Sequence, residues 1–129
     1  MATIFEGIKG IKTVYQDILN ELKKGDEYYV FNLGEKDNYI QHKLFFRNYH
    51  LKREKKGIKV KIITDTILKN IVQEVFTGLK KCELKYIDEP MPSSTVIYGN
   101  KVATILLGDR PSAFVIESKK NYEQYRSFF

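Results

Sequence analysis

The spacing of apolar residues switches repeatedly between a helical and a strand-like pattern, and this alternation constrains the fold more than any other feature of the chain. Three stretches carry apolar residues every three or four positions, as expected for helices with one buried face. A short apolar run typical of a strand follows each of them, and Gly25, Gly34 and Gly57 mark ends of segments. The sequence therefore predicts helix 9–24, strand 28–33, helix 38–56, strand 58–63, helix 67–79 and strand 82–86.

The last third of the chain differs, because strands there follow one another without helices between them. A Gly99-Asn100 hairpin signal and a turn at 108–111 separate three predicted strands, over 95–98, 101–107 and 112–116. Ser118 can cap a final helix. Three helix-linked strands followed by such a meander predict an α/β fold, in which a mixed sheet carries helices on its faces.

The whole chain, residues 1–129, is expected to form a single domain, because no linker, repeat or low-complexity tract interrupts it. Hydrophobic residues make up 43% of the sequence, which is enough for a sizeable core. Cys82 is the one cysteine, so no intramolecular disulfide can form, and no segment has the length and apolarity of a membrane span or signal peptide. The cytoplasm is the expected location.

A basic run at 47–61 is the strongest charge feature in a chain whose formal net charge is +6. Such a run could contact nucleic-acid phosphates. It is also typical of a solvated helix end whose cations complement the helix dipole, and this interpretation is favoured because a buried strand follows directly. The cations of the run are Arg47, Lys52, Arg53, Lys55, Lys56, Lys59 and Lys61.

Residues for catalysis or metal binding do not form a recognisable motif. His42 and His50 are eight residues apart, which on one helix means about 12 Å at 1.5 Å per residue, so they cannot share a metal ion. The serines lack a nucleophile motif, and Cys82 alternates with apolar neighbours as a buried residue does. Glycine-rich phosphate loops are also missing. The sequence predicts no catalytic residues, no metal site and no cofactor.

Three stretches of the sequence are distinctive as a set: FFRNYHLKR at 45–53 with GIKVK at 57–61, TVIYGNKVA at 95–103, and AFVIE at 113–117. Together they resemble the phospholipase D-like domain that follows the DNA-binding helix-turn-helix in TrmB-type archaeal transcription regulators. The resemblance spans nearly the whole chain from Phe5 onward. It implies a phospholipase D-like mixed β-sheet with helices on both faces, in the order βαβαβαβ, followed by an antiparallel meander and a C-terminal helix.

The resemblance also bears on catalysis, because the parent phospholipase D superfamily uses His-x-Lys and, further along, Asp for phosphodiester chemistry. If Tyr98 occupies the Asp position, the His and Lys positions fall on Met91 and Ser93. One residue later, the three positions fall on Pro92, Ser94 and Gly99. Neither alignment can form a phosphoenzyme, so the chain is expected to be non-catalytic.

The resemblance further implies a homodimer, since half-length phospholipase D-like units pair about a two-fold axis around a shared cleft. A small effector, sugar-like or phosphorylated, is expected there, and open α/β sheets bind ligands at the carboxyl ends of their strands. The terminal Phe128-Phe129 pair needs cover from the core or from another subunit. The expected ligand-binding residues are Asn32, Ser93, Ser94, Tyr98 and Glu117.

Three functions therefore remain open at this stage. The first is an effector-sensing and dimerisation domain of a TrmB-type regulator, in which only a separate helix-turn-helix, absent from this chain, contacts DNA. The second is a stand-alone nucleic-acid-binding module that uses the basic run 47–61. The third is a dimerisation module that binds neither a small effector nor nucleic acid. No membrane partner is expected in any of the three cases.

Overall fold

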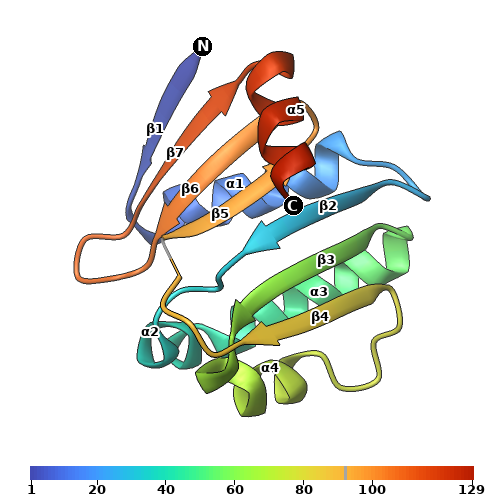
Figure 1. Ribbon diagram of the computed structural model, residues 1–129, viewed down its shortest axis with the longest axis vertical. Helices are drawn as coiled ribbons and strands as arrows, with labels where there is room; N and C mark the ends of the chain where they lie inside the picture. The colour runs from blue at the N-terminus through green and yellow to red at the C-terminus, as the bar shows by residue number, and fades with distance from the viewer. Residues whose placement is uncertain (92) are drawn as a thin grey trace.

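The computed structural model describes residues 1–91 and 93–129, which form one mixed β-sheet with helices on both faces (Figure 1). The described residues give seven strands in the order β1-β7-β6-β5-β2-β3-β4. The elements along the chain are β1 (Ala2–Glu6), α1 (Gly7–Glu21), β2 (Glu27–Phe31), α2 (Lys36–Gln41), α3 (Lys43–Lys56), β3 (Lys59–Asp65), η1 (Thr66–Leu68), α4 (Lys69–Val75), β4 (Cys82–Ile87), β5 (Ser94–Tyr98), β6 (Lys101–Leu106), β7 (Ser112–Glu117) and α5 (Lys119–Phe128).

The strand directions confirm the predicted fold class. Strands β2, β3 and β4 run parallel and are linked by helices, whereas β5, β6 and β7 form an antiparallel meander that joins the sheet through β2 and β5. The order βαβαβαβ is also present, because β1 precedes α1 and pairs antiparallel with β7 at the edge of the sheet. Apolar periodicity had located no residues for β1.

The back face of the sheet holds most of the core and is covered by α1, α3 and α4 (Figure 1). Ile11, Val14 and Ile18 recur at the spacing that keeps one side of α1 buried against the strands. Alternate residues of the parallel strands, such as Val60 and Ile62 on β3, meet these helices.

All three helices predicted before the meander have different boundaries in the structure. The predicted helix 9–24 is α1, which begins at Gly7 and ends at Glu21. The stretch predicted as one helix, 38–56, is divided at His42, which ends α2 and precedes α3. Gly57 then ends α3 with a φ of 84°, a left-handed conformation that glycine adopts without strain. The predicted helix 67–79 is shorter than expected, since α4 ends at Val75.

The front face of the sheet, which faces the viewer in Figure 1, carries only α5 among the described helices. Ser118 caps this helix as predicted, because its hydroxyl oxygen accepts the backbone N–H of Asn121 at 3.2 Å. Phe129 packs against Tyr29 and Phe31, with ring centroids 5.0 and 4.8 Å apart. The core thus covers Phe129, while Phe128 stays 81% exposed.

Candidate functional site

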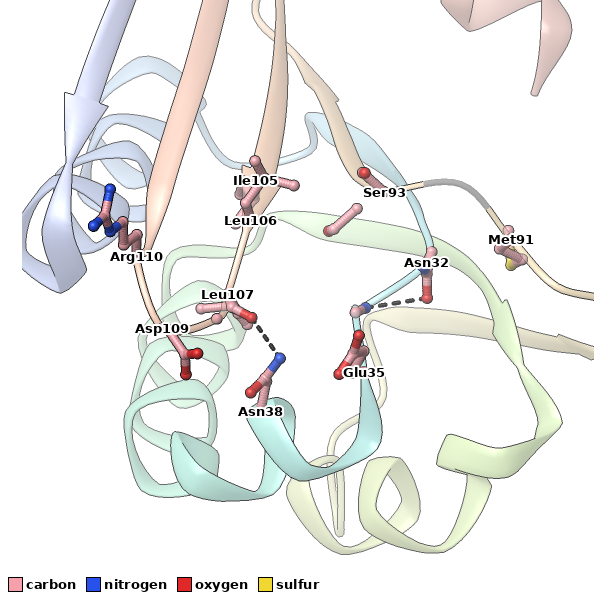
Figure 2. Close-up of a pocket in the computed structure, with 13 residues that line it drawn as sticks. Asn32, Glu35, Asn38, Met91, Ser93, Ile105, Leu106, Leu107, Asp109 and Arg110 are labelled. Carbon is pink, nitrogen blue, oxygen red and sulfur yellow. Dashed lines mark hydrogen bonds between the residues drawn. The ribbon is translucent and has the colours of Figure 1, made fainter.

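A pocket of about 540 Å³ opens at the carboxyl edge of the parallel strands, where β2 ends and the β6–β7 turn approaches α2 (Figure 2). The loop that leads into β5 closes one side. This is the edge at which open α/β sheets bind ligands. The lining residues are Asn32, Gly34, Glu35, Asn38, Met91, Ser93, Ser94, Ile105, Leu106, Leu107, Gly108, Asp109 and Arg110.

The wall formed by the end of β2 depends on an unusual backbone conformation at Asn32, whose φ is 59°. Asparagine tolerates this left-handed region better than most residues. The Asn32 N–H donates to the carbonyl of Ile63 at 2.7 Å, and its side-chain oxygen accepts the N–H of Gly34 at 3.1 Å. These bonds turn the chain sharply away from the sheet and fix the Asn32 side chain at the pocket.

The opposite wall is built by a contact between segments that are far apart in the sequence. The side-chain amide of Asn38 on α2 donates to the carbonyl oxygen of Leu107, which follows β6 (Figure 2). This bond ties α2 to the β6–β7 turn and brings the exposed side chains of Asp109 and Arg110 to the rim, across from Glu35.

The described lining of the pocket combines polar side chains with an apolar surface. Amides and hydroxyls from Asn32, Asn38 and Ser93 lie near an apolar surface that includes Ile105 and Met91. Two carboxylates and one guanidinium complete the lining, which contains no histidine, cysteine or lysine among its described residues.

The five predicted ligand-binding residues fall into two groups. Asn32, Ser93 and Ser94 lie together in the pocket, with Ser94 buried. Tyr98 and Glu117 lie at the other end of the strands, where β2 begins, because β5 and β7 run antiparallel to β2. The rule that ligands bind at the carboxyl ends of strands had been applied to every predicted strand, although the sequence does not show in which direction each strand runs.

Tyr98 and Glu117 line a smaller cavity of about 150 Å³, beside an ion pair that joins α1 to the β5–β6 hairpin. The Tyr98 hydroxyl donates to Asp17 Oδ2 at 2.7 Å, and the Lys101 ammonium lies 2.8 Å from the same oxygen. Burial, together with the hydrogen bond and charge of Asp17, raises the pKa of Tyr98 above its ordinary value. The contacts made by Tyr98 therefore stabilise the position of α1.

The positions that the phospholipase D pattern assigns to catalysis are also separated. Met91 and Ser93 line the pocket, while Tyr98 lies at the other edge of the sheet. In the alternative alignment, Ser94 is the first residue of β5 and Gly99 follows its last residue, so these two positions also lie at opposite ends of the strand. Pro92 lies outside the described residues. Neither alignment brings its described residues to one place.

Both histidines lie outside the described pocket lining. His50 is buried against Phe76 and Arg53. Burial, reinforced by the guanidinium groups of Arg53 and Arg47, holds the pKa of His50 well below its ordinary value. Its imidazole is a neutral acceptor for the Arg53 Nε–H at 2.9 Å.

The basic run 47–61 does not form one cationic surface. Arg47 donates to the carbonyls of Val75 and Thr77, at 2.8 and 2.7 Å, and Lys56 donates to the carbonyl of Leu19. Lys59 and Lys61 are residues of β3 on the front face of the sheet, the face away from α3, and both form ion pairs with Glu83 of β4.

The prediction of a solvated helix end is wrong for Arg53, which has an exposed fraction of 0%. One of its terminal nitrogens donates to the carbonyls of Ile58 and Lys81, at 2.7 and 2.8 Å. The neighbouring Glu54 accepts backbone N–H groups from Lys80 and Lys81. This end of α3 therefore holds the segment before β4 in place. Lys52, Lys55 and Lys56 remain exposed, although the Lys56 ammonium also bonds to the Leu19 carbonyl.

Two negative findings apply to residues 1–91 and 93–129. No three histidine, cysteine, aspartate or glutamate residues of this part approach closely enough to hold a metal ion. No helix there is both long and apolar enough to cross a membrane.

Sequence reasoning missed Glu35, Asn38, Asp109 and Arg110 as pocket residues. The turn at 108–111 was recognised, but its neighbour in space was not, because sequence spacing does not show that α2 and the β6–β7 turn meet. The Asx-type turn at Asn32 and Gly34 is a local signal that could have located the β2 wall.

Comparison with known proteins relates the chain to one architecture. No protein-family model and no curated protein sequence matches it. Among solved structures it is similar to TrmBL2, described as an archaeal chromatin protein with a novel mode of DNA binding, with a TM-score of 0.64 at 17% sequence identity. The match covers 98% of this chain and 49% of TrmBL2, so the chain spans about half the length of that protein. The shared fold is the one that the resemblance to TrmB-type regulators implied.

Proposed function

We propose that this chain is a non-catalytic, phospholipase D-like regulatory domain of the TrmB type, which binds a small polar effector and forms a homodimer. One observation carries the proposal: the pocket at the carboxyl edge is rich in amides and hydroxyls but combines them with no histidine, cysteine or lysine among its described lining residues. Its volume of about 540 Å³ lies within the range of small-molecule sites.

The charges at the rim favour a neutral hydroxylated effector over a phosphorylated one. Glu35 and Asp109 carry two negative charges, and Arg110 carries the one positive charge of the described lining. Carboxylates and amides accept hydrogen bonds from hydroxyl groups, whereas two carboxylates oppose the approach of a phosphate. In this proposal Asn32, Ser93 and Ser94 belong to the effector site, Tyr98 holds α1 in place through Asp17, and Glu117 lies outside the effector site.

The likeness to TrmBL2 supports a role within a DNA-associated protein. DNA binding is described for that whole protein, of which this chain matches about half. In our proposal a separate helix-turn-helix reads DNA, and this domain supplies sensing and pairing. The dispersal of the basic run supports this division, because most of its cations bind carbonyls or carboxylates of the same chain.

Thermal unfolding with added ligands tests effector binding. A ligand at about 100 times its Kd stabilises the folded state by about 2.7 kcal/mol, which raises Tm by several degrees. The panel comprises neutral mono- and disaccharides, their phosphate esters and inorganic phosphate. We expect a neutral sugar to raise Tm, an Asp109→Ala variant to lose that response, and an Asp88→Ala variant, changed at an exposed carboxylate outside the pocket, to keep it.

Three results would contradict the proposal. The first is a panel without any response. The second is a response that Asp109→Ala leaves intact. The third is hydrolysis of a generic phosphodiester by the purified chain that disappears in a Ser93→Ala variant, since this would show that the pocket is catalytic.

A further inference from the structure

Beyond the part that α5 covers, the front face of the sheet is exposed over β1 and over parts of β7 and β6, and its side chains there are mostly apolar. The strand register places Ile4, Phe114, Thr104, Thr95 and Phe31 in one row across five strands. Ile4 is 62% exposed and Phe114 is 43% exposed. Leu106 and Ile116, in the neighbouring rows, are also exposed. We call Ile4, Thr104, Leu106, Phe114 and Ile116 the open face.

The opposite end of the same sheet face provides an internal comparison. There β3 and β4 present Lys59, Lys61, Glu83 and Lys85, and three of these four side chains form ion pairs. Charged residues of this kind are how a sheet tolerates water on one face. The residues of the open face are uncharged, and Glu6 at the end of β1, whose register row includes Leu106, lies at its border. A mostly uncharged face of this kind is typical of a surface covered by a partner.

The edge of the sheet shows the same contrast. β1 has the sequence Ala-Thr-Ile-Phe-Glu, with one charge at its end, while the other edge strand, β4, alternates charged and apolar residues. Edge strands that remain in solvent usually carry charges along their length. β1 therefore belongs to the uncovered apolar region.

We infer that the open face packs against the open face of a second copy of this chain, about a two-fold axis and with the sheets face to face. The inference rests on the homodimer of the proposed function and assigns its interface. A two-fold pair needs one self-complementary patch. Because the chain has a net charge of +6, two copies repel each other at most surfaces, and the open face offers an approach without lysine or arginine.

The available area and the shape of the face agree with this pairing. The exposed parts of the open face and of the adjoining Phe128 amount to on the order of 500 Å² of apolar surface, which would form the core of a standard interface of about 800 Å² per partner. α5 projects from the same face and contacts β5, β6 and β7. Two copies therefore fit with their β1, β7 and β6 ends overlapped and each α5 beyond the partner's β1 edge.

Sedimentation of the whole chain over about 1 to 100 μM tests the inference. The variants are Phe114→Lys and Thr104→Lys, which place a charge at the centre of the open face. The matched controls are Leu44→Lys and Ile67→Lys, at apolar residues that are 71% and 61% exposed elsewhere. We expect a wild-type dimer, a rise of at least about 100-fold in the dimer Kd in the two open-face variants, and no change in the controls.

The remaining outcomes each overturn the inference in a recognisable way. A monomeric wild-type chain at about 100 μM removes both the interface and the homodimer. A dimer that survives both open-face changes keeps the homodimer but places its interface elsewhere. If Ala2→Pro abolishes the dimer and Phe114→Lys does not, the two copies pair through the edge strand β1 and not through the open face. The Tm of each variant is measured to show that it is folded. If Phe114→Lys proves to be unfolded, the result for Thr104→Lys is used instead. Effector binding is measured separately by thermal shift.

Discussion

Arg53 offers the sharpest test of the structure, because its sequence context and its structural environment predict opposite effects of mutation. It lies among lysines near the end of α3, yet its side chain is fully buried. It donates to the carbonyls of Ile58 and Lys81 and to His50. A solvated cation could be replaced at almost no cost in stability, whereas this one joins α3 to the segments that enter β3 and β4.

The Arg53→Met variant keeps most of the side-chain volume and removes every donor. The buried Ile58 carbonyl and the His50 imidazole nitrogen then lose this donor, each at a cost of about 1–3 kcal/mol, whereas the partly buried Lys81 carbonyl keeps the backbone N–H of Val60. Removing the buried guanidinium offsets part of that cost, because its desolvation is relieved. We expect the free energy of unfolding to fall by about 2–4 kcal/mol, which corresponds to a Tm decrease of roughly 8–15 °C for a domain of this size.

Urea denaturation followed by circular dichroism measures the change, with Lys55→Met as the control on the same turn of the helix. The control should differ from wild type by less than about 0.5 kcal/mol, as is usual for an exposed residue. The m-values should agree among the three proteins, since the same surface is exposed on unfolding. A loss below about 1 kcal/mol in Arg53→Met would refute the assigned role of Arg53.

Three further predictions concern other parts of the molecule. Because the folded protein holds the pKa of His50 below its ordinary value of 6.5, the unfolded chain binds this proton more readily, and stability should fall as the pH drops below about 6.5. His50→Gln should flatten the dependence of Tm on pH, whereas the control His42→Gln should not. A His50→Gln profile as steep as that of wild type would count against this reasoning. Tyr98→Phe removes a hydrogen bond to a partly exposed carboxylate and should cost about 1 kcal/mol in urea denaturation, whereas Tyr125→Phe at an exposed site should be neutral; equal effects would argue against the Asp17 contact. A double Lys52→Gln, Lys55→Gln variant should leave oligonucleotide affinity unchanged in a fluorescence titration, and a salt-sensitive affinity that it abolishes would revive the nucleic-acid interface.

Much of the fold could be predicted because it depends on local periodicity. The apolar stripe of α1 and the alternation in β3 each determine an element and its buried side. β1 could not be found in this way, since its apolar residues do not alternate with charges, and pairing with β7 and packing against α1 hold it in the sheet. The burial of Arg53 likewise depends on a carbonyl 28 residues away, which no local pattern reveals.

The candidate site was partly predictable for a related reason. The rule that ligands bind at carboxyl ends of strands located Asn32, and the loop before β5 supplied Ser93 and Ser94. Tyr98 was assigned to the same place because the sequence does not show that β5 runs antiparallel to β2. That direction depends on how the strands pair in the sheet, which is a matter of tertiary contacts. Asn38, Asp109 and Arg110 were missed because a single long-range hydrogen bond brings their segments together.

The pocket and the open face adjoin each other at the end of β6, which determines how they must be tested. Leu106 lies on the open face and also lines the pocket, and the next residue, Leu107, accepts the hydrogen bond from Asn38 that holds the pocket wall. A change at Leu106 would alter both surfaces and could not separate effector binding from pairing. Phe114 does not line the pocket, and Asp109 lies at the pocket rim on the turn beyond β6. Substitutions at these two residues can therefore distinguish a domain that pairs without a ligand from one whose pairing responds to it.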